Sequence, residues 1–163
     1  MTRLLVPLAL LLLPSCAMKG EAPPAHHSPN ALESIRYETS PCFGTCPIYN
    51  VTVSNAGKGI FQGQRFTSAT GTETFAVTRD QFEAFAKALA PYRGKTGGQG
   101  GAGNCKRMHT DDITVRVTWT ATNGRIQKLS HYFGCDSPEY DAMEAGLREA
   151  PSKLPIAGMI GQR

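Results

Sequence analysis

Apolar and polar side chains alternate along six short segments of the chain, a pattern typical of strands that bury one face. These segments are residues 35–39, 49–54, 59–66, 72–77, 113–120 and 125–133. Asn123 and Gly124, between the last two segments, are a strong signal for a hairpin turn. A simple two-residue turn there would place Trp119 opposite Lys128, and a bulge would change that register.

A helical pattern follows the fourth of these segments. Thr78 and Gln81 occupy the two positions of a capping box, in which each side chain bonds the backbone N–H of the other residue. The apolar side chains that follow are spaced i, i+3, i+4 and i+7, so they form one stripe on a helix. They are Phe82, Phe85, Ala86 and Leu89. Pro91 ends this helix, whose stripe is expected to pack on the sheet.

A second helix is expected near the C-terminus. Ser137 and Pro138 fit its N-cap and first helical positions, and it would run to about Glu149. The sequence therefore predicts an α+β fold, with an antiparallel sheet of about six strands and two helices, one of them packed on a sheet face. Residues 94–104 contain six glycines and are expected to form a mobile loop.

The first fifteen residues have the pattern of an export signal. Arg3 supplies a positive charge, and the apolar run of residues 4–13 is broken only by Pro7. Ten residues are too few to cross a hydrocarbon core of about 30 Å, which argues against a permanent transmembrane helix. Residues 1–15 are therefore predicted to be a signal peptide of the lipoprotein type.

Residues 13–16, Leu-Pro-Ser-Cys, resemble the bacterial lipobox, in which an apolar residue and two small residues precede a lipidated cysteine. We therefore expect acylation of Cys16, with palmitate among the acyl chains. Several acyl chains hold a protein at a membrane far better than one. Pro14 is atypical, and the alternative is an ordinary signal peptide that is cleaved elsewhere. By resemblance to Gram-negative lipoproteins, the non-acidic Ala17 favours the outer membrane, with the protein facing the periplasm.

Residues 16–33 are expected to comprise the lipidated cysteine and a flexible tether, and residues 34–163 a single domain. The tether contains three prolines and no apolar period. His26 and His27 lie within it, but two imidazoles without a third ligand make a weak metal site.

Composition and charge narrow the classes of partner. The chain is 40% hydrophobic, which is enough to bury a core. It has 17 basic and 13 acidic side chains, and without Arg3 the positive excess falls to three. This excess is too small to indicate nucleic-acid binding. The expected partners are the membrane, through the lipid anchor, and a protein or polymer of the envelope; one sequence does not predict the oligomeric state.

Export would place the remaining cysteines in an oxidising compartment, where an even number favours disulfides. Once Cys16 carries lipid, the remaining thiols are those of Cys42, Cys46, Cys105 and Cys135. Four cysteines allow three pairings, of which we favour Cys42–Cys46 with Cys105–Cys135. The first bridge requires its segment to turn, because a fully extended one would separate the two Cα atoms by about 13 Å, against about 4–7 Å in a bridge. Gly44 permits that turn.

Residues 42–49, Cys-Phe-Gly-Thr-Cys-Pro-Ile-Tyr, carry the most specific pattern of the chain. With Ile35-x-Tyr37 before them, and Val51-x-Val53, Gly57 and Phe61-x-Gly63 after them, they resemble an uncharacterised bacterial family, domain of unknown function 6438. Its members often are lipoproteins or secreted proteins. The resemblance runs from about residue 34 to past residue 135 and implies a strand-rich domain with one main helix. It implies no activity.

The candidate binding loop consists of Phe43, Gly44, Thr45 and Pro47. A loop constrained by a disulfide loses little entropy on binding, so it is suited to recognition. Phe43 is equally compatible with a place in the core. We therefore expect a binding or structural module that has no catalytic residue and no cofactor.

Two other functions remain open. Cys42 and Cys46, followed by proline, have the spacing of the copper and thiol-redox motif of Sco-type copper chaperones, with His131 or His109 as a further ligand. In that family a strand and a helix flank the motif, whereas two predicted strands flank it here. The second alternative is a hydrolase of envelope polymers, for which His109, Asp111 and Asp112 would be acid/base groups without a recognisable nucleophile.

Overall fold

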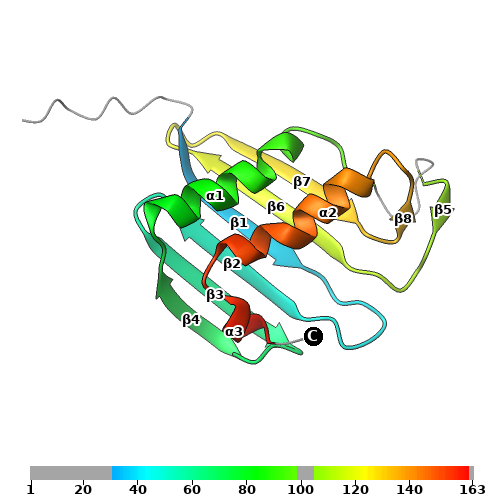
Figure 1. Ribbon diagram of the computed structural model, residues 1–163, viewed down its shortest axis with the longest axis horizontal. Helices are drawn as coiled ribbons and strands as arrows, with labels where there is room; N and C mark the ends of the chain where they lie inside the picture. Colours follow the sequence, from blue (N-terminus) through cyan, green and yellow to red (C-terminus); the bar gives the residue numbers. More distant parts are fainter. Residues whose placement is uncertain (1–30, 99–104, 162–163) are drawn as a thin grey trace, which may run out of the picture.

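A computed structural model describes residues 31–98 and 105–161 of the chain. Its main sheet has six strands in the order β4-β3-β2-β1-β6-β7, and every neighbouring pair is antiparallel (Figure 1). The strands are β1 (Leu32–Thr39), β2 (Ile48–Ser54), β3 (Lys58–Arg65), β4 (Gly71–Ala76), β6 (Thr114–Ala121) and β7 (Ile126–Tyr132). This sheet confirms the predicted α+β class.

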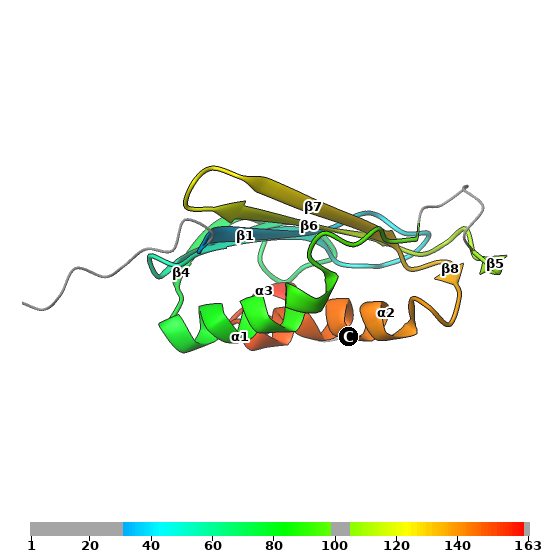
Figure 2. The same ribbon diagram turned by 90° about the horizontal axis from the view of Figure 1, so that it is seen from above.

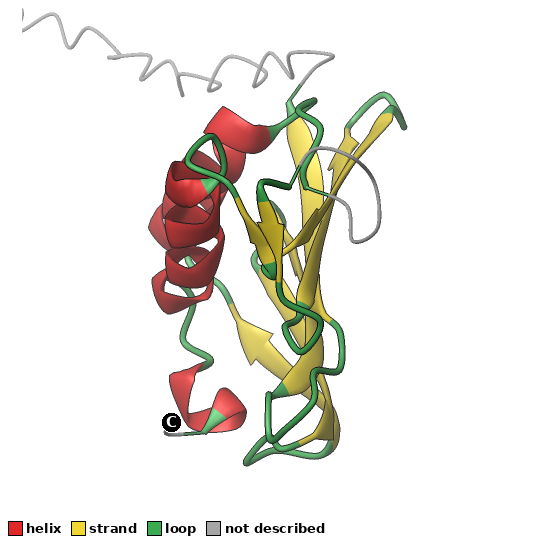
Figure 3. Cartoon of the chain, turned by 90° about the vertical axis from the view of Figure 1, so that its right-hand side faces the viewer, coloured by secondary structure: helices red, strands yellow, loops and turns green. Residues whose placement is uncertain are grey.

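Two helices, α1 (Arg79–Leu89) and α2 (Asp141–Glu149), form a second layer on one face of the sheet (Figures 2 and 3). The smaller elements are the 3₁₀ turns η1 (Ala90–Tyr92) and η2 (Ala150–Lys153), the short helix α3 (Ala157–Ile160), and a separate strand pair, β5 (Arg107–Met108) with β8 (Cys135–Asp136). The sequence did not predict this strand pair.

The core lies between the two layers. Every second side chain of the central strands points toward the helices, so the predicted alternation becomes one apolar face. The largest fully buried side chains include Ile35, Phe61, Phe85, Val117 and Trp119. Burying a large apolar side chain stabilises the fold by about 1.5–3 kcal/mol. The Tyr37 hydroxyl, also buried, donates to the backbone carbonyl of Leu147, and so ties β1 to α2 at 2.9 Å.

The capping box at the start of α1 is confirmed. The Thr78 hydroxyl accepts from the Gln81 backbone N–H at 3.2 Å, and the Gln81 side chain accepts from the Thr78 backbone N–H at 2.9 Å. The helix buries Phe82, Phe85 and Leu89, three residues of the predicted stripe. It ends where the proline-containing η1 begins.

The β6–β7 hairpin differs by one residue from the register of a simple two-residue turn. Trp119 pairs with Gln127, and Lys128 pairs with Thr118. The reason is a three-residue loop, closed by the Arg125 carbonyl accepting from the Ala121 N–H at 2.9 Å. Gly124, with φ +78°, supplies the left-handed conformation that such a loop requires. Because a one-residue shift exchanges the two faces of a strand, Lys128 points away from the helices.

The predicted start of the second helix is also wrong. Ser137 is buried in a turn, where its carbonyl accepts from the Tyr140 N–H at 2.8 Å, and α2 begins only at Asp141. Serine and proline favour such a turn as readily as a helix start. The first strand begins at Leu32, slightly before the predicted boundary of the domain at residue 34.

The glycine-rich segment lacks regular structure where it is described, but part of it is fixed. Gly97 and Gly98 are buried against the edge strand β7. The Gly98 carbonyl accepts from the Tyr132 N–H at 2.9 Å. A Cβ atom at Gly97 would lie 2.4 Å from the Ser130 carbonyl, so this close approach requires glycine. The expectation of a mobile loop is therefore wrong for these two residues.

Candidate functional site

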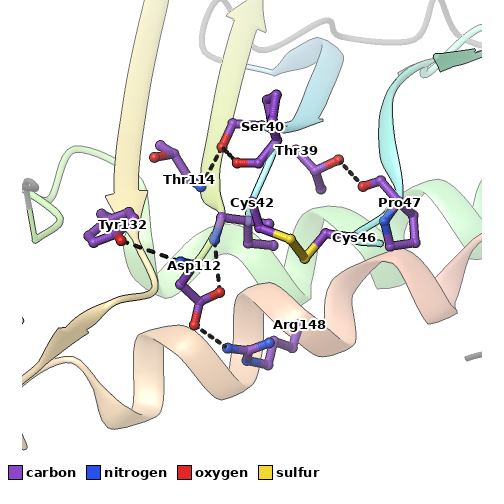
Figure 4. The surroundings of a disulfide bond; sticks show 11 residues. Thr39, Ser40, Cys42, Cys46, Pro47, Asp112, Thr114, Tyr132 and Arg148 are labelled. Atoms are coloured by element: carbon purple, nitrogen blue, oxygen red, sulfur yellow. Dashed lines mark hydrogen bonds and ion pairs between the residues drawn. A yellow bond between two sulfur atoms is a disulfide. The ribbon is translucent and has the colours of Figure 1, made fainter. Parts of the chain in front are cut away.

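The loop between β1 and β2 is closed by a disulfide between Cys42 and Cys46, whose Cα atoms are 5.9 Å apart. The Thr39 hydroxyl fastens the base of this loop, since it donates to the Pro47 carbonyl at 2.8 Å and accepts from the Tyr49 N–H at 3.1 Å (Figure 4). The predicted bridge is therefore present, and the loop that it closes is held at its base by hydrogen bonds.

The candidate binding loop lies at the surface. The Phe43 side chain is 89% exposed, so it lies in solvent and not in the core. Gly44 and Thr45 are also exposed, and Pro47 is half-buried. The Phe43 backbone N–H donates to the Asp111 carbonyl at 3.3 Å. The most exposed large apolar side chain among the described residues is therefore carried on a constrained loop.

A groove of about 680 Å³ runs beside this loop. Its walls are residues 42–47, the end of β1 at Thr39, and Phe66, residues 111–113, Arg148 and Ile160. Phe66 is 44% exposed and has φ +56°, a conformation rare for a residue with a large side chain. Backbone strain of this kind concentrates at functional sites. Here Phe66 carries it at the rim of the groove.

A smaller cavity of about 280 Å³ adjoins the groove, because Thr39, Ile113, Arg148 and Ile160 line both. Its other walls are mainly apolar: Tyr37, Tyr49, Phe133, Pro151, Ser152, Ala157 and Gly161. The site therefore has an apolar inner part, between the sheet and the C-terminal elements, and a wider outer part at the disulfide loop.

Arg148, from α2, lies where the two parts meet. Its guanidinium stacks over the Phe133 ring at 4.2 Å and lies 3.9 Å from the Asp112 carboxylate and 3.8 Å from that of Glu144 (Figure 4 shows Arg148 and Asp112). The other Asp112 oxygen accepts from the Ile113 N–H at 2.8 Å. Asp111 is exposed beside them. The lining of the groove thus has two negative side chains and one positive one, and a third carboxylate, that of Glu144, contacts Arg148 without lining the groove.

His131 lies near this cluster but does not line the groove. Its side chain is fully buried, Nδ1 accepts from the Gly98 N–H at 2.9 Å, and Nε2 lies 3.3 Å from Glu144 Oε1. Burial, and then the positive charge of Arg148, lower the pKa of His131 to about 4. Because the imidazole is neutral at pH 7, its contact with Glu144 is a hydrogen bond from Nε2–H rather than an ion pair.

Glu144 connects the buried histidine to Arg148. Burial raises the pKa of the Glu144 carboxyl; the Arg148 charge opposes this shift, and nearby aspartates, Asp112 among them, reinforce it. His131, Glu144, Arg148 and Asp112 thus form a chain of polar contacts from the core to the groove. The structure places Asp111 and Asp112 in the groove and His131 behind it.

The second disulfide lies away from the groove. Cys105 and Cys135 are bonded with a Cα–Cα distance of 5.0 Å, so both favoured pairings are present. The bond joins the segment before β5 to β8, and the Arg107–Asp136 ion pair at 2.7 Å lies beside it. Cys16, His26 and His27 lie outside the described residues.

Copper or thiol-redox chemistry and hydrolysis, the two alternative functions, each need particular side chains. Copper binding by Cys42, Cys46 and His131 requires free thiols, and in this structure the two sulfurs are bonded to each other. Within residues 31–98 and 105–161, no group of three His, Cys, Asp or Glu side chains lies close enough together to hold a metal ion. His109 is exposed, and its backbone carbonyl accepts from the Tyr132 hydroxyl.

Sequence reasoning missed Phe66 and Arg148. Phe66 is the last residue of a predicted strand segment and carries no motif, and Arg148 resembles any surface arginine of an amphipathic helix. Phe66 reaches the groove because β3 ends at the same end of the sheet as the disulfide loop (Figure 1), and Arg148 reaches it from α2, where its guanidinium lies 3.9 Å from Asp112. No local signal marked either residue.

Comparisons with known proteins give one match. The model of the family described as domain of unknown function (DUF6438) matches residues 33–153, which include the disulfide loop and most of the groove. No curated protein and no solved structure matches the chain. Among the described residues, no helix is long and apolar enough to cross a membrane.

Proposed function

Because the chain belongs to the family of domain of unknown function 6438, whose description names no activity, we propose a function from the sequence and the geometry of the groove. The protein is an exported lipoprotein of the bacterial envelope, anchored through Cys16. Its folded domain is a non-catalytic module that binds an envelope protein or polymer in the groove beside the Cys42–Cys46 loop.

The exposed Phe43 carries this proposal. The Phe43 side chain is large, aromatic and 89% exposed. Its burial by a partner would stabilise the complex. The disulfide and the Thr39 hydrogen bonds already hold the loop, so binding orders little additional chain. An aromatic residue on a rigid loop, next to a groove, has the character of an interface hot spot.

The position of the tether supports the same function. The tether joins the domain at the start of β1, and the disulfide loop follows the end of β1, at the opposite end of the sheet (Figure 1). At about 3.3 Å per residue, the eight residues of β1 separate the two by roughly 25 Å. A domain held by its tether therefore presents the groove away from its own membrane.

Affinity purification of the full-length protein from detergent-solubilised membranes tests the binding role. We expect a partner that co-purifies with the wild type and is lost, by about tenfold or more, from Phe43→Ala and Thr45→Ala. Ile126→Ala is the matched control, because Ile126 is an exposed apolar residue of β7 outside the groove. If the wild type and the three variants co-purified equal amounts of the same partners, the groove would not be the binding site.

A further inference from the structure

We propose that the groove recognises a polypeptide segment in which a large apolar side chain, seated in the inner cavity, is flanked by a lysine or arginine held at the acidic rim. This inference rests on the binding function proposed above and specifies the chemistry of the partner. It is carried by the size and lining of the inner cavity and by the charges around its mouth.

The inner cavity has the size and character of a pocket for one side chain. An apolar cavity of about 150 Å³ is sufficient to hold benzene. The cavity here measures about 280 Å³, and Tyr49, Ile113, Phe133 and Ile160 provide apolar walls. It therefore has room for one aromatic or large aliphatic group. Such an anchor is common in polypeptides and absent from an unsubstituted glycan, so the cavity favours a polypeptide over a polymer of sugars.

The mouth of the cavity favours a positive charge beside that anchor. Asp111 and Asp112 line the groove, and Glu144 lies 3.8 Å from the Arg148 guanidinium. Asp112 and Glu144 both face Arg148, which also stacks on Phe133, so this cation is already shared between two carboxylates. Asp111 is exposed and faces the groove opening. Among the residues that line the groove, Asp111 and Asp112 outnumber Arg148, so the lining has a net negative charge although the whole chain has a net charge of +4, and a basic side chain is complementary there.

The aromatic rim adds a second contact for the same group. Phe43 and Phe66 both line the outer groove, and both are exposed. The face of an aromatic ring attracts a guanidinium or ammonium group within about 6 Å of its centre. The Arg65 guanidinium already lies over the Phe66 ring, 4.9 Å from its centre, so the Phe43 ring is the one that remains for a partner. A lysine or arginine next to the anchor can therefore lie between the Phe43 ring and the Asp111 carboxylate.

Selection from a displayed library of random dodecapeptides on the full-length protein in detergent micelles tests the inference. We expect enriched peptides to carry Phe, Tyr, Trp, Leu or Ile with Lys or Arg within two positions. Affinity of a selected peptide, measured by fluorescence polarisation, should fall about tenfold or more with Ala157→Trp or Ser152→Trp. Both residues are exposed and line the inner cavity from different positions, so the two variants fill it without replacing a buried side chain.

Charge is tested separately. Asp111→Lys should weaken binding about fivefold or more, and higher salt should weaken it further. Glu33→Lys, an equal change of charge on an exposed residue at the other end of β1, should leave affinity unchanged.

The inference is overturned if no peptide is enriched, if enriched peptides are acidic or lack an apolar anchor, or if cavity-filling variants bind as the wild type does. Two other occupants would also overturn it. One is a second copy of the chain, seen as a dimer that Ala157→Trp dissociates; the other is a co-purifying lipid that the same variant releases. If the inference fails while Phe43-dependent partners still co-purify, the proposed function stands; if both experiments fail, neither stands.

Discussion

At the scale of single residues, His131 joins the core to the groove and determines a pH dependence. The neutral ring accepts from Gly98 at Nδ1 and donates to Glu144 from Nε2. Protonation would place a proton on Nδ1, where the Gly98 N–H already points. Burial, and then the positive charge of Arg148, disfavour the protonated ring, which is why the pKa of His131 falls to about 4 from an ordinary value of 6.5.

The free energy of unfolding should consequently fall as the pH falls from about 6.5 towards 4. In that window the unfolded chain takes up a proton at His131 and the folded chain does not, so the unfolded state gains stability, by up to about 3 kcal/mol. Glu144, whose folded pKa is raised, binds a proton earlier in the folded state and offsets part of this loss. Urea unfolding followed by the fluorescence of Trp119, the only tryptophan, measures the change.

The matched variant is His131→Gln, which keeps a polar side chain but does not titrate in this range. Its free energy of unfolding should be lower than that of the wild type at pH 7.5 and should decline less between pH 6.5 and 4. Parallel curves for the two proteins would show that His131 is not the group responsible.

At the scale of elements, the two disulfides have different roles. Cys105–Cys135 spans 30 residues and Cys42–Cys46 only four. In the chain-entropy model, removing the long bridge costs about 3–4 kcal/mol and removing the short one about 2 kcal/mol. The short bridge instead fixes the loop that presents Phe43, so its main effect should be on binding.

We therefore expect Cys105→Ala/Cys135→Ala to lower the free energy of unfolding more than Cys42→Ala/Cys46→Ala does. Alanine is chosen because Cys135 is fully buried, where a serine hydroxyl would lack a partner. The Cys42→Ala/Cys46→Ala protein should stay folded and lose affinity for its partner. Urea unfolding and the co-purification assay, applied to both variants, separate these effects; the reverse order of stabilities, or full binding without the short bridge, would contradict the assignment.

The elements differ in how far the sequence predicts them. The six main strands and α1 follow from period-two alternation and from a capping box, both of which are local patterns. The β6–β7 register depended on whether the turn has two or three residues, and Asn123-Gly124 permits both. Ser137-Pro138 fits a turn as well as a helix start. The β5–β8 pair has only two residues per strand and adjoins the Cys105–Cys135 bridge, so no periodic pattern marks it.

The candidate site was predicted only in part for a similar reason. Residues 42–47 are contiguous and carry a recognisable motif, so the sequence identified the loop. The groove also needs Phe66, Asp111 and Arg148, which come from separate segments and meet only in the folded chain. Whether Phe43 points inward or outward depends on how the loop packs, and composition does not determine this.

At the scale of the whole molecule, the account predicts one covalent form of the native protein. Intact-mass analysis should find a chain that begins at residue 16, carries acyl groups on Cys16, and is four hydrogens lighter than its reduced form because of the two disulfides. Cys16→Ser should abolish the added lipid mass and release the protein from the membrane fraction. A chain that retains Met1 and five free thiols would contradict both the anchor and the export on which the bridges depend.

The two ends of the sheet have different roles in the proposed function: the anchored segment enters at one, and the disulfide loop lies at the other. The disulfide loop, which lines the groove, lies at the opposite end of the sheet from the start of β1 (Figure 1). With the proposed anchor at Cys16, this arrangement predicts that the disulfide loop meets its partner in the space beyond the membrane.

Photo-crosslinking in living cells tests that claim most directly. A benzoylphenylalanine introduced at position 43 of the full-length lipoprotein lies at the rim of the groove, and the same residue at position 126 is the exposed control. On irradiation, the account predicts a discrete adduct from position 43, absent from position 126 and lost when Ala157→Trp fills the inner cavity. No adduct at position 43, or the same adducts from both positions, would contradict a binding function for the groove.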